Sequence, residues 1–300
     1  MWKQLKNEER GNIIVIFAFA LSMLMGFAAI AVDAGQLYFE KSNLQKTVDA
    51  AALAGAHAYY SGDSNLEAQE IADLNGFQIA GSQITVENGR VTVQHESNVP
   101  LSFARMIGIN DADVFASSTA ATGALGKGDR IAPIAIEESE IPDGKYLNCA
   151  KPEDGGNCGY LTGNGTGASS LNEALVYGKT IEIGTYELET EPGAKVGQVR
   201  SAVDEIISKD SGNNKCDSYS TADASCYRVI TVAVTESGAF SDASGRDHVN
   251  VLGFASYWVE GFTNQGGNSR IVGHYIDMVR LGELDPNAKN YGSHVVKLME

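Results

Sequence analysis

The sequence predicts an α+β fold: an amino-terminal transmembrane helix that continues as a long stalk helix packed on a small α+β domain, followed by a β-rich carboxy-terminal domain. Three observations support this prediction. Residues Ile13–Val32 form an uncharged apolar run whose only polar side chain is Ser22. Apolar residues recur at helical spacing beyond this run, with no proline before Pro100. The later part of the chain contains short apolar runs separated by turn residues, which is typical of strands.

The apolar run Ile13–Val32 is long enough to cross a membrane. At about 1.5 Å per residue, a helix of this length covers roughly the 30 Å hydrocarbon core of a bilayer. Lys3, Lys6 and Arg10 precede the run, and Asp33 follows it at once. Short basic flanks stay in the cytoplasm, so we expect a single-pass protein of the cell membrane whose amino terminus is cytoplasmic and whose bulk is extracytoplasmic.

Two other interpretations of this run compete with a retained anchor. A cleaved signal peptide also combines a basic start with an apolar core, and Ala29-Ile30-Ala31 is an acceptable cleavage triplet. However, the apolar core of a signal peptide spans about 7–15 residues, so the length of this run favours retention. A buried core helix would need a far larger core than this chain can build.

The charge of the chain lies almost entirely beyond the apolar run. The net charge is −16, and residues 1–32 hold three basic and two acidic side chains, which leaves 19 basic and 36 acidic ones in the rest. So acidic a part is repelled by nucleic acid and by anionic lipid, and no phosphate-binding role is favoured. With 33 glycines, 6 prolines and 43% hydrophobic residues, the composition indicates folded, loop-rich β structure.

The four cysteines predict two local disulfides in an oxidising compartment. Cys149 and Cys158 lie nine residues apart, and Cys216 and Cys226 lie ten apart. Zinc sites prefer spacings of about two to four residues. Four cysteines allow three pairings, of which two local loops are the simplest, and each loop would contribute roughly 2–3 kcal/mol. Four reduced, buried thiols are the alternative.

The predicted elements of the first half form an α+β unit. Asp49–Ala58 consists almost entirely of small residues with high helix propensity, so the helix that starts at Ile13 should continue to about Tyr60 and pack closely on its neighbours. Asn88-Gly89, between two alternating runs, is the preferred turn of a β-hairpin. The other expected elements are helices at Leu66–Phe77 and Leu101–Ile109, and strands at Gln83–Glu87, Arg90–Gln94 and Val114–Ala120.

Gly123–Asp129 is predicted to be a flexible linker between two domains. Beyond it, Gly197–Lys209 is an amphipathic helix that would cover a β-rich domain. The expected strands of that domain are Ile131–Ile136, Thr180–Ile183, Arg228–Thr235, Val249–Phe262, Ile271–Val279 and His294–Met299. The predicted divisions are residues 1–12 for the cytoplasmic terminus, 13–32 for the membrane helix, 33–122 for the stalk and α+β domain, 123–129 for the linker and 130–300 for the β-rich domain.

No motif predicts catalysis, a cofactor or a metal site, since the sequence has no HExxH, GxSxG, P-loop or EF-hand loop. Asp247-His248 near Ser241 and Ser244 is more typical of turn chemistry than of a nucleophile with its base. The carboxylates of Asp242 and Asp247 fix too few oxygens for a calcium site.

Two further features have ordinary structural explanations. Gly163–Gly167 resembles a phosphate-binding loop only in glycine content, because neither the preceding strand nor the following Lys-Ser/Thr is present. The aromatic residues Phe254, Tyr257, Trp258 and Phe262 could form an exposed binding stripe. At strand spacing, we expect them instead to divide between the core and the solvent face.

Several ordered segments of the first half resemble the TadG-like proteins of the tight-adherence (Flp) pilus-assembly system. The resemblance covers roughly residues 8–125 and implies a membrane-anchored accessory protein of pilus biogenesis with a pilin-like α+β domain. The segments that carry it are Glu9–Ile13, Ala31–Gly35, Leu44-Gln45, Val48–Ala56, Phe103–Ile109 and Ala116–Ala121.

Two departures limit what this resemblance implies. Prepilins of such systems carry Glu five residues after the glycine at which prepilin peptidase cuts, but Ile16 stands in that place after Gly11. Some TadG proteins carry a metal-binding Asp-x-Ser-x-Ser, which neither Asp217–Thr221 nor Asp242–Arg246 matches. We therefore expect neither peptidase processing nor a metal-dependent adhesion site.

The expected function is that of a non-enzymatic, membrane-anchored pilus-assembly or minor pilin-like protein that acts by protein–protein contacts. Its expected partners are Tad/Flp assembly proteins or pilin-like subunits and the lipid bilayer, with self-association as a further option. Small residues let membrane helices approach closely, so the candidate contact positions are Gly26, Ala28, Ala29 and Ala31, with lipid exposure as the alternative. The competing hypotheses are a membrane-tethered enzyme of the cell-wall hydrolase type and a secreted adhesin.

Overall fold

The computed structural model describes residues 10–148, 159–161, 168–187, 196–240, 248–265 and 268–299. The chain divides into two compact units. Unit 1 runs to Ala120 and takes in the residues from Leu298 onward, and unit 2 runs from Ala121 to Lys297.

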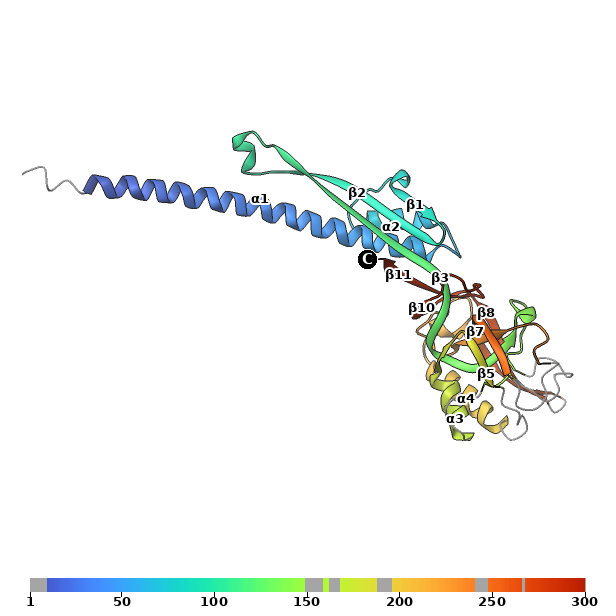
Figure 1. The fold of residues 1–300 in the computed structure, drawn as a ribbon. Coiled ribbons are helices and arrows are strands. Elements are labelled where there is room, and N and C mark those ends of the chain that lie inside the picture. Colours follow the sequence, from blue (N-terminus) through green and yellow to red (C-terminus); the bar gives the residue numbers. More distant parts are fainter. Residues whose placement is uncertain are drawn as a thin grey trace, which may run out of the picture. The chain divides into compact units, whose positions relative to one another are not determined.

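Unit 1 is built on one long helix, α1, which runs from Arg10 to His57 without interruption (Figure 1). It contains the whole apolar run, and it ends within a few residues of the position that the sequence predicts. Beyond the apolar run, Leu44 and Val48 are fully buried, as are the small residues Ala51, Ala52 and Ala56. The prediction of a stalk helix with a small, closely packed face is therefore confirmed.

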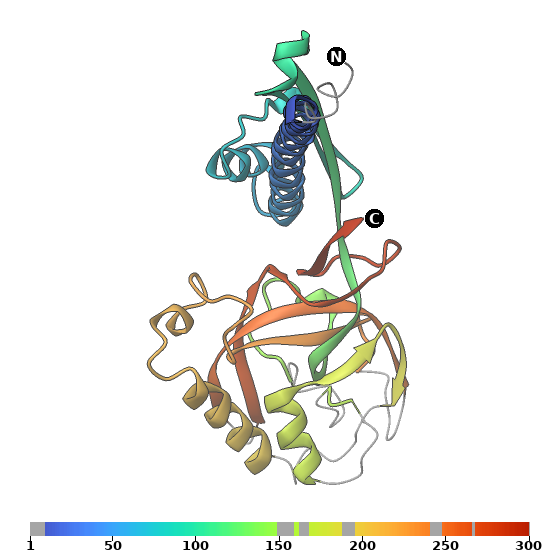
Figure 2. The ribbon, with the colours of Figure 1, turned by 90° about the vertical axis from the view of Figure 1, so that its left-hand side faces the viewer.

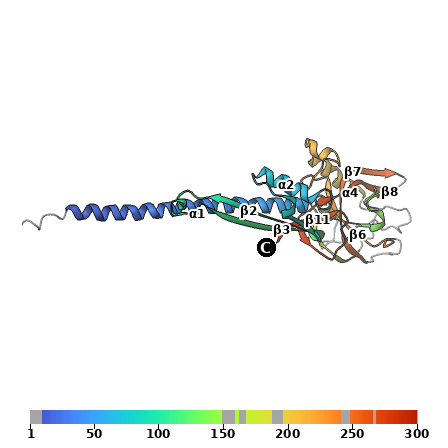
Figure 3. The ribbon, with the colours of Figure 1, turned by 90° about the horizontal axis from the view of Figure 1, so that it is seen from above.

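The remaining elements of unit 1 pack on this buried part of α1. Asp63 caps α2 by accepting hydrogen bonds from the backbone N–H groups of Asn65 and Leu66 at 2.9 and 3.2 Å. Asn88 and Gly89 both have positive φ, as the predicted hairpin turn between β1 and β2 requires. Figures 1 and 3 both show β2 and β3 lying alongside α1. The elements are α2 (Ser64–Leu74), η1 (Gly81–Gln83), β1 (Ile84–Glu87), β2 (Arg90–Pro100), η2 (Ala104–Ile107) and the first part of β3 (Asp111–Glu137).

Strand β3 corrects the predicted linker, because Gly123–Asp129 is extended strand. In unit 2 this stretch pairs with β10, where Lys127 lies opposite Glu283, and with β4, where Lys127 lies opposite Glu182. Its glycines allow close approach: a Cβ on Gly126 would lie 2.6 Å from the Cβ of Asp285. Glycine serves tight strand packing here, which a sequence pattern alone does not distinguish from flexibility.

Unit 2 is β-rich, as predicted, and its described residues include two α-helices, of which the sequence predicted α4. The central strand β6 pairs in parallel with β3 and antiparallel with β7, so the sheet is mixed. Strands β5 and β8 also pair with β7. Figure 2 shows the two helices α3 and α4 beside one another. The elements after β3 are η3 (Glu138–Glu140), α3 (Ala168–Tyr177), β4 (Lys179–Glu182), β5 (Gly184–Glu187), α4 (Val196–Lys209), η4 (Asn214–Asp217), β6 (Val229–Thr235), β7 (His248–Gln265), β8 (Asn268–Ile276), β9 (Met278–Val279), β10 (Gly282–Leu284) and β11 (Ser293–Met299).

The two faces of this sheet contribute to separate hydrophobic clusters. Along β6, Val232 and Val234 pack in one cluster together with residues of α3 and α4. Ala233 points into the other cluster, which contains Phe240 and Phe254. Every residue of β6 is buried. A strand buried on both faces reads as a continuous apolar run, which is why the sequence identified it clearly.

The aromatic residues of β7 do not form an exposed stripe. Phe254 lies in one hydrophobic cluster and Tyr257 in the other. Trp258 is also buried, where its Nε1 donates a hydrogen bond to the backbone oxygen of Cys216 at 2.9 Å. The expected division between core and solvent is wrong for these three residues, because helices and loops cover both faces of β7. Phe262 is half-buried.

Candidate functional site

The apolar half of α1 has no packing partner among the described residues. From Ile13 to Val32, no described side chain is buried, and the large apolar ones are exposed. The hydroxyl of Ser22 donates to the backbone oxygen of Ala18 at 2.8 Å, so this polar group is satisfied within the helix. By length and composition, this helix could span a membrane.

The four small residues proposed as contact positions remain a prediction. Gly26, Ala28 and Ala31 are exposed, Ala29 is half-buried, and a Cβ on Gly26 would meet nothing within 4 Å. Helical periodicity places them on two sides of α1. Gly26 and Ala29 share one side with Asp33, whereas Ala28 and Ala31 share another. A single partner helix would therefore contact one pair.

Asp33, the first residue after the apolar run, holds the loop between β2 and β3. It is only 6% exposed although its side chain is charged. Its Oδ1 accepts hydrogen bonds from the N–H groups of Ser102 and Phe103 at 2.8 and 3.2 Å. Its Oδ2 accepts from Phe103 and Ala104 at 3.1 and 2.7 Å. Three backbone N–H groups, which make four hydrogen bonds to one carboxylate, satisfy its charge and fix the start of η2 against α1.

Further polar contacts hold the same hairpin along α1. Gln36 donates through Nε2 to the backbone oxygen of Pro100 at 3.1 Å. Lys41 donates to the backbone oxygen of Phe115, and Gln45 donates to that of Ser117 at 3.2 Å. Glu40 accepts from the hydroxyl of Ser97 at 3.0 Å. The stalk is thus attached to β2 and β3 by side chains spread over several helical turns.

The sequence predicted only part of this attachment. It identified the small, apolar face of α1 but gave no role to Asp33. The N–H groups that bind Asp33 belong to the backbone about seventy residues later, and backbone donors have no residue signature. The loop itself was predicted as a helix over Leu101–Ile109, whereas only the short turn η2 forms, closed by Gly108 with φ 93°. The available sequence signal is an Asp directly after an apolar run.

In unit 2, the disulfide between Cys216 and Cys226 forms as predicted, with a Cα–Cα distance of 5.6 Å. Both cysteines are buried. Asp210 lies close to the two sulfur atoms, and its carboxylate accepts N–H hydrogen bonds from Tyr227 and Arg228 at 2.9 and 2.7 Å. Because both sulfurs are bonded to one another, this group offers no thiolate for a metal.

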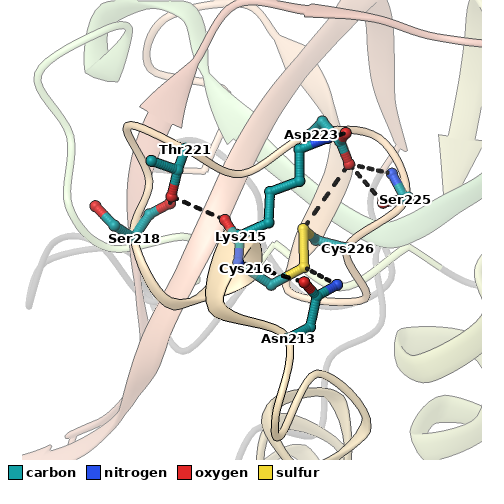
Figure 4. A network of polar contacts seen from close by, with 8 residues as sticks. All are labelled: Asn213, Lys215, Cys216, Ser218, Thr221, Asp223, Ser225 and Cys226. Carbon is teal, nitrogen blue, oxygen red and sulfur yellow. Dashed lines mark hydrogen bonds and ion pairs between the residues drawn. A yellow bond between two sulfur atoms is a disulfide. The ribbon is translucent and has the colours of Figure 1, made fainter.

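Polar side chains stabilise the loop that the disulfide closes (Figure 4). Lys215 forms an ion pair with Asp223, and Ser225 donates to the same carboxylate through its hydroxyl and its N–H. The hydrogen bond from Lys215 and those from Ser225 lower the pKa of Asp223 to about 2. The hydroxyl of Thr221 donates to the backbone oxygen of Lys215 at 2.8 Å. These groups stabilise the turn, which accounts for the polar residues of the loop.

Several candidate residues lie outside the described residues. They are Cys149 and Cys158, the glycine-rich stretch Gly163–Gly167, and the loop that contains Ser241, Asp242, Ser244 and Asp247. The pairing of Cys149 with Cys158 therefore stays a prediction.

Unit 2 also contains a cavity of about 470 Å³ that the sequence did not predict. Two arginines, Arg130 and Arg280, line it together with Tyr177 and Tyr227. The guanidinium of Arg130 lies 5.7 Å from the ring centre of Tyr227. Burial, together with the charge of Arg130, lowers the pKa of Arg280 to about 10. No ion pair joins either guanidinium to a carboxylate within the part of the chain that the structure describes.

Neither arginine stood out in a sequence with a net charge of −16. Arg280 donates through Nε to the hydroxyl of Thr231 at 2.6 Å and through Nη2 to the backbone oxygen of Val229 at 3.3 Å. These bonds orient the guanidinium without neutralising it. Asp129 also lines the cavity, so two positive charges and one negative charge meet there, an exception to the acidic character of the chain.

Comparison with known proteins gives a family match for the amino-terminal segment. Residues 11–58 match the family model described as "Putative Flp pilus-assembly TadE/G-like". The match covers the apolar run and the stalk to the end of α1, and it confirms the resemblance that the motifs indicated. Comparisons with curated proteins and with solved structures gave no match.

Proposed function

We propose that this chain is a membrane-anchored, non-enzymatic accessory protein of Flp pilus assembly, because residues 11–58 match the family model of TadE/G-like Flp pilus-assembly proteins. It acts through protein–protein contacts at the cell envelope. The proposal rests on one observation: a single unbroken helix combines an unpacked apolar half with a half that is packed in a folded unit. Such a helix would hold unit 1 at a fixed distance from the membrane.

In the proposed topology, Ile13–Val32 crosses the cell membrane with the amino terminus in the cytoplasm and both units outside. The basic residues before the run support this orientation. The Cys216–Cys226 disulfide adds support, since such bonds persist in oxidising compartments. The competing secreted adhesin would lack the run, so the mass of the mature protein separates the two.

The contact side of the membrane helix provides the first test. Changing Gly26 to Ile places a branched side chain where two helices would approach closely, so we expect a severalfold lower recovery of Flp assembly proteins after crosslinking in native membranes. Recovery is measured by mass spectrometry of the purified complexes. Met25→Ile, one position away on a different side of α1, is the matched control and should leave recovery unchanged. Equal recovery with both variants would show that Gly26 faces lipid.

Binding of an anionic ligand by unit 2 is a second candidate function, favoured by the cavity around Arg130 and Arg280. Two guanidinium groups share this cavity with one carboxylate, that of Asp129, and among the described residues neither forms an ion pair. They repel one another, and a phosphate or carboxylate group would relieve that repulsion. We expect inorganic phosphate at ten times its Kd to stabilise the protein by about 1.4 kcal/mol.

This second function is tested by thermal unfolding in a phosphate titration. The double variant Arg130→Gln with Arg280→Gln should lose the phosphate-dependent rise in Tm. Arg200→Gln removes one positive charge from an exposed position of α4 and should keep it. A rise of equal size in both variants would assign the effect to nonspecific salt stabilisation and remove the cavity from consideration.

A further inference from the structure

The loop between β2 and β3, which we call the tip (Leu101–Asn110), exposes apolar side chains beside the end of the membrane segment. Met106 and Ile107 are 83% and 79% exposed. Phe103 and Ile109 in the same loop are also exposed. A soluble surface seldom gathers so many apolar groups in one short loop unless they contact another surface. The exposed side chains therefore form a docking surface, and its occupant has to be identified.

We infer that this occupant is the lipid bilayer. The tip lies on the extracytoplasmic surface of the cell membrane and inserts Met106 and Ile107 into the interfacial layer. The inference rests on the proposed anchoring of Ile13–Val32 in the membrane. It adds a second membrane contact, about seventy residues away in sequence from the first.

The height of the tip along α1 supports lipid as the occupant. Asp33 directly follows the apolar run, and its carboxylate binds the N–H groups of Ser102, Phe103 and Ala104 at 2.7–3.2 Å. The backbone of the tip is thereby held at the level where the helix leaves the hydrocarbon core. The polar headgroup layer extends roughly 5–8 Å beyond that core on each side. A loop fixed at this level lies within the headgroup layer.

The other sides of α1 carry residues typical of the same layer. Tyr38 and Phe39 are exposed and follow Asp33 by five and six residues, which corresponds to roughly 8–9 Å along the helix. Helical periodicity turns both away from the side that Asp33 occupies. Aromatic residues are enriched at the membrane–water interface. The tip would lie within the headgroup layer, and these aromatic residues would lie at its water-facing edge on other sides of α1.

The charged residues around the tip also fit a loop that contacts lipid on one side and water on the other. Arg105 is exposed in the tip, and its long side chain can place the guanidinium among lipid phosphates while its neighbours insert. Asp111 and Asp113 stand where β3 begins, and both bind the side chain of Asn98 at 3.2 and 2.7 Å. These carboxylates mark the side of the tip that faces water.

Depth-dependent fluorescence quenching tests this inference on the full chain in neutral phosphatidylcholine vesicles. Met106→Trp places a reporter in the tip, in a Trp2→Phe background. Phe115→Trp is the matched control. Phe115 is also exposed, and its backbone binds Lys41, which lies eight residues and roughly 12 Å beyond Asp33. Phospholipids brominated near the top of the acyl chains should quench the tryptophan at position 106 at least threefold more than the one at position 115.

The role of Asp33 is tested in the same vesicles. Asp33→Asn removes the charge that the three N–H groups bind, so quenching at position 106 should fall at least twofold. Ile107→Trp provides a second reporter in case Met106→Trp folds poorly. Equal quenching at positions 106, 107 and 115 would overturn the inference.

Flotation of the vesicles separates this inference from the proposed function. A chain that floats with the vesicles but shows no preferential quenching retains its anchor and lacks the second contact. A chain that does not float contradicts both the anchor and the tip.

Discussion

Replacing Leu21 and Leu24 by arginine is expected to keep the chain out of the membrane and to leave Cys216 and Cys226 as free thiols. The two positions lie one turn apart in the middle of the apolar run, and both side chains are exposed on α1. An arginine at the centre of a membrane helix costs roughly 2.5–3.5 kcal/mol on insertion scales. Two such changes should exceed what the rest of the run contributes to insertion.

Two measurements on the same cells report the result. Alkaline extraction shows whether the protein is integral to the membrane, and alkylation before and after reduction shows which peptides contain thiols. The double variant should be extracted and should be alkylated at both cysteines without reduction. Leu21→Ala with Leu24→Ala keeps the run apolar, so it should remain integral and oxidised. The topology is wrong if the unchanged protein has free thiols at both positions.

The disulfide is a sharp reporter because of its environment. Both cysteines are buried beside Trp258, and Asn213 donates through Nδ2 to the sulfur of Cys216 at 3.1 Å. Once formed, the bond is shielded from small reductants. A loop of this length contributes roughly 2–3 kcal/mol to stability. Oxidation at this site therefore records the compartment in which unit 2 folded.

The sequence predicted those elements whose signal is local. Each of three elements is identified by a pattern within one short stretch of sequence. They are the apolar run, the Asn88-Gly89 hairpin and the buried strand β6. The glycine-rich stretch at Gly123–Asp129 misled because glycine suits both a flexible joint and a close strand contact. Only the partners β4 and β10, which lie far along the chain, decide between these.

The candidate sites depended even more on contacts between distant segments. Asp33 could be noticed as a charge at the end of an apolar run, but its partners are backbone groups. Arg130 and Arg280 share a cavity although 150 positions separate them in the sequence. Overall composition even opposed such a site, since the net charge predicts no anion binding. The electrostatic potential in a cavity depends on which charges the fold brings together, and the net charge of the chain does not reveal it.

Unit 1 should lose stability when Gly55 is changed to leucine. Gly55 lies in the stretch of α1 that faces α2 and β2. A Cβ at this position would lie 2.8 Å from the backbone oxygen of Ser64 and 2.9 Å from Cγ1 of Val91. Backbone cannot yield as a flexible side chain does, so α1 and α2 must separate. Overpacking of this kind costs typically 1–3 kcal/mol, occasionally more.

Gly35→Leu is the matched control on the same helix. A Cβ on Gly35 would meet nothing within 4 Å, so this change adds only the helix propensity of leucine, which is up to about 1 kcal/mol in favour of the helix. Gly55→Leu gains the same helix propensity, so the two variants should differ by the cost of overpacking alone, roughly 1–3 kcal/mol. Hydrogen exchange of the α2 amides in detergent measures the difference, and a factor of ten in rate corresponds to about 1.4 kcal/mol where exchange requires unfolding.

The comparison of the two leucine variants also tests how α1 holds the rest of unit 1. If α1 carries unit 1 through close contact at Gly55, Gly55→Leu should speed exchange in α2 at least tenfold while α1 stays helical. Equal exchange in both variants would mean that α2 is held by the hairpin and not by the helix. The polar contacts from Asp33 to Gln45 would then carry the attachment, and a rigid link from membrane to unit 1 would depend on them alone.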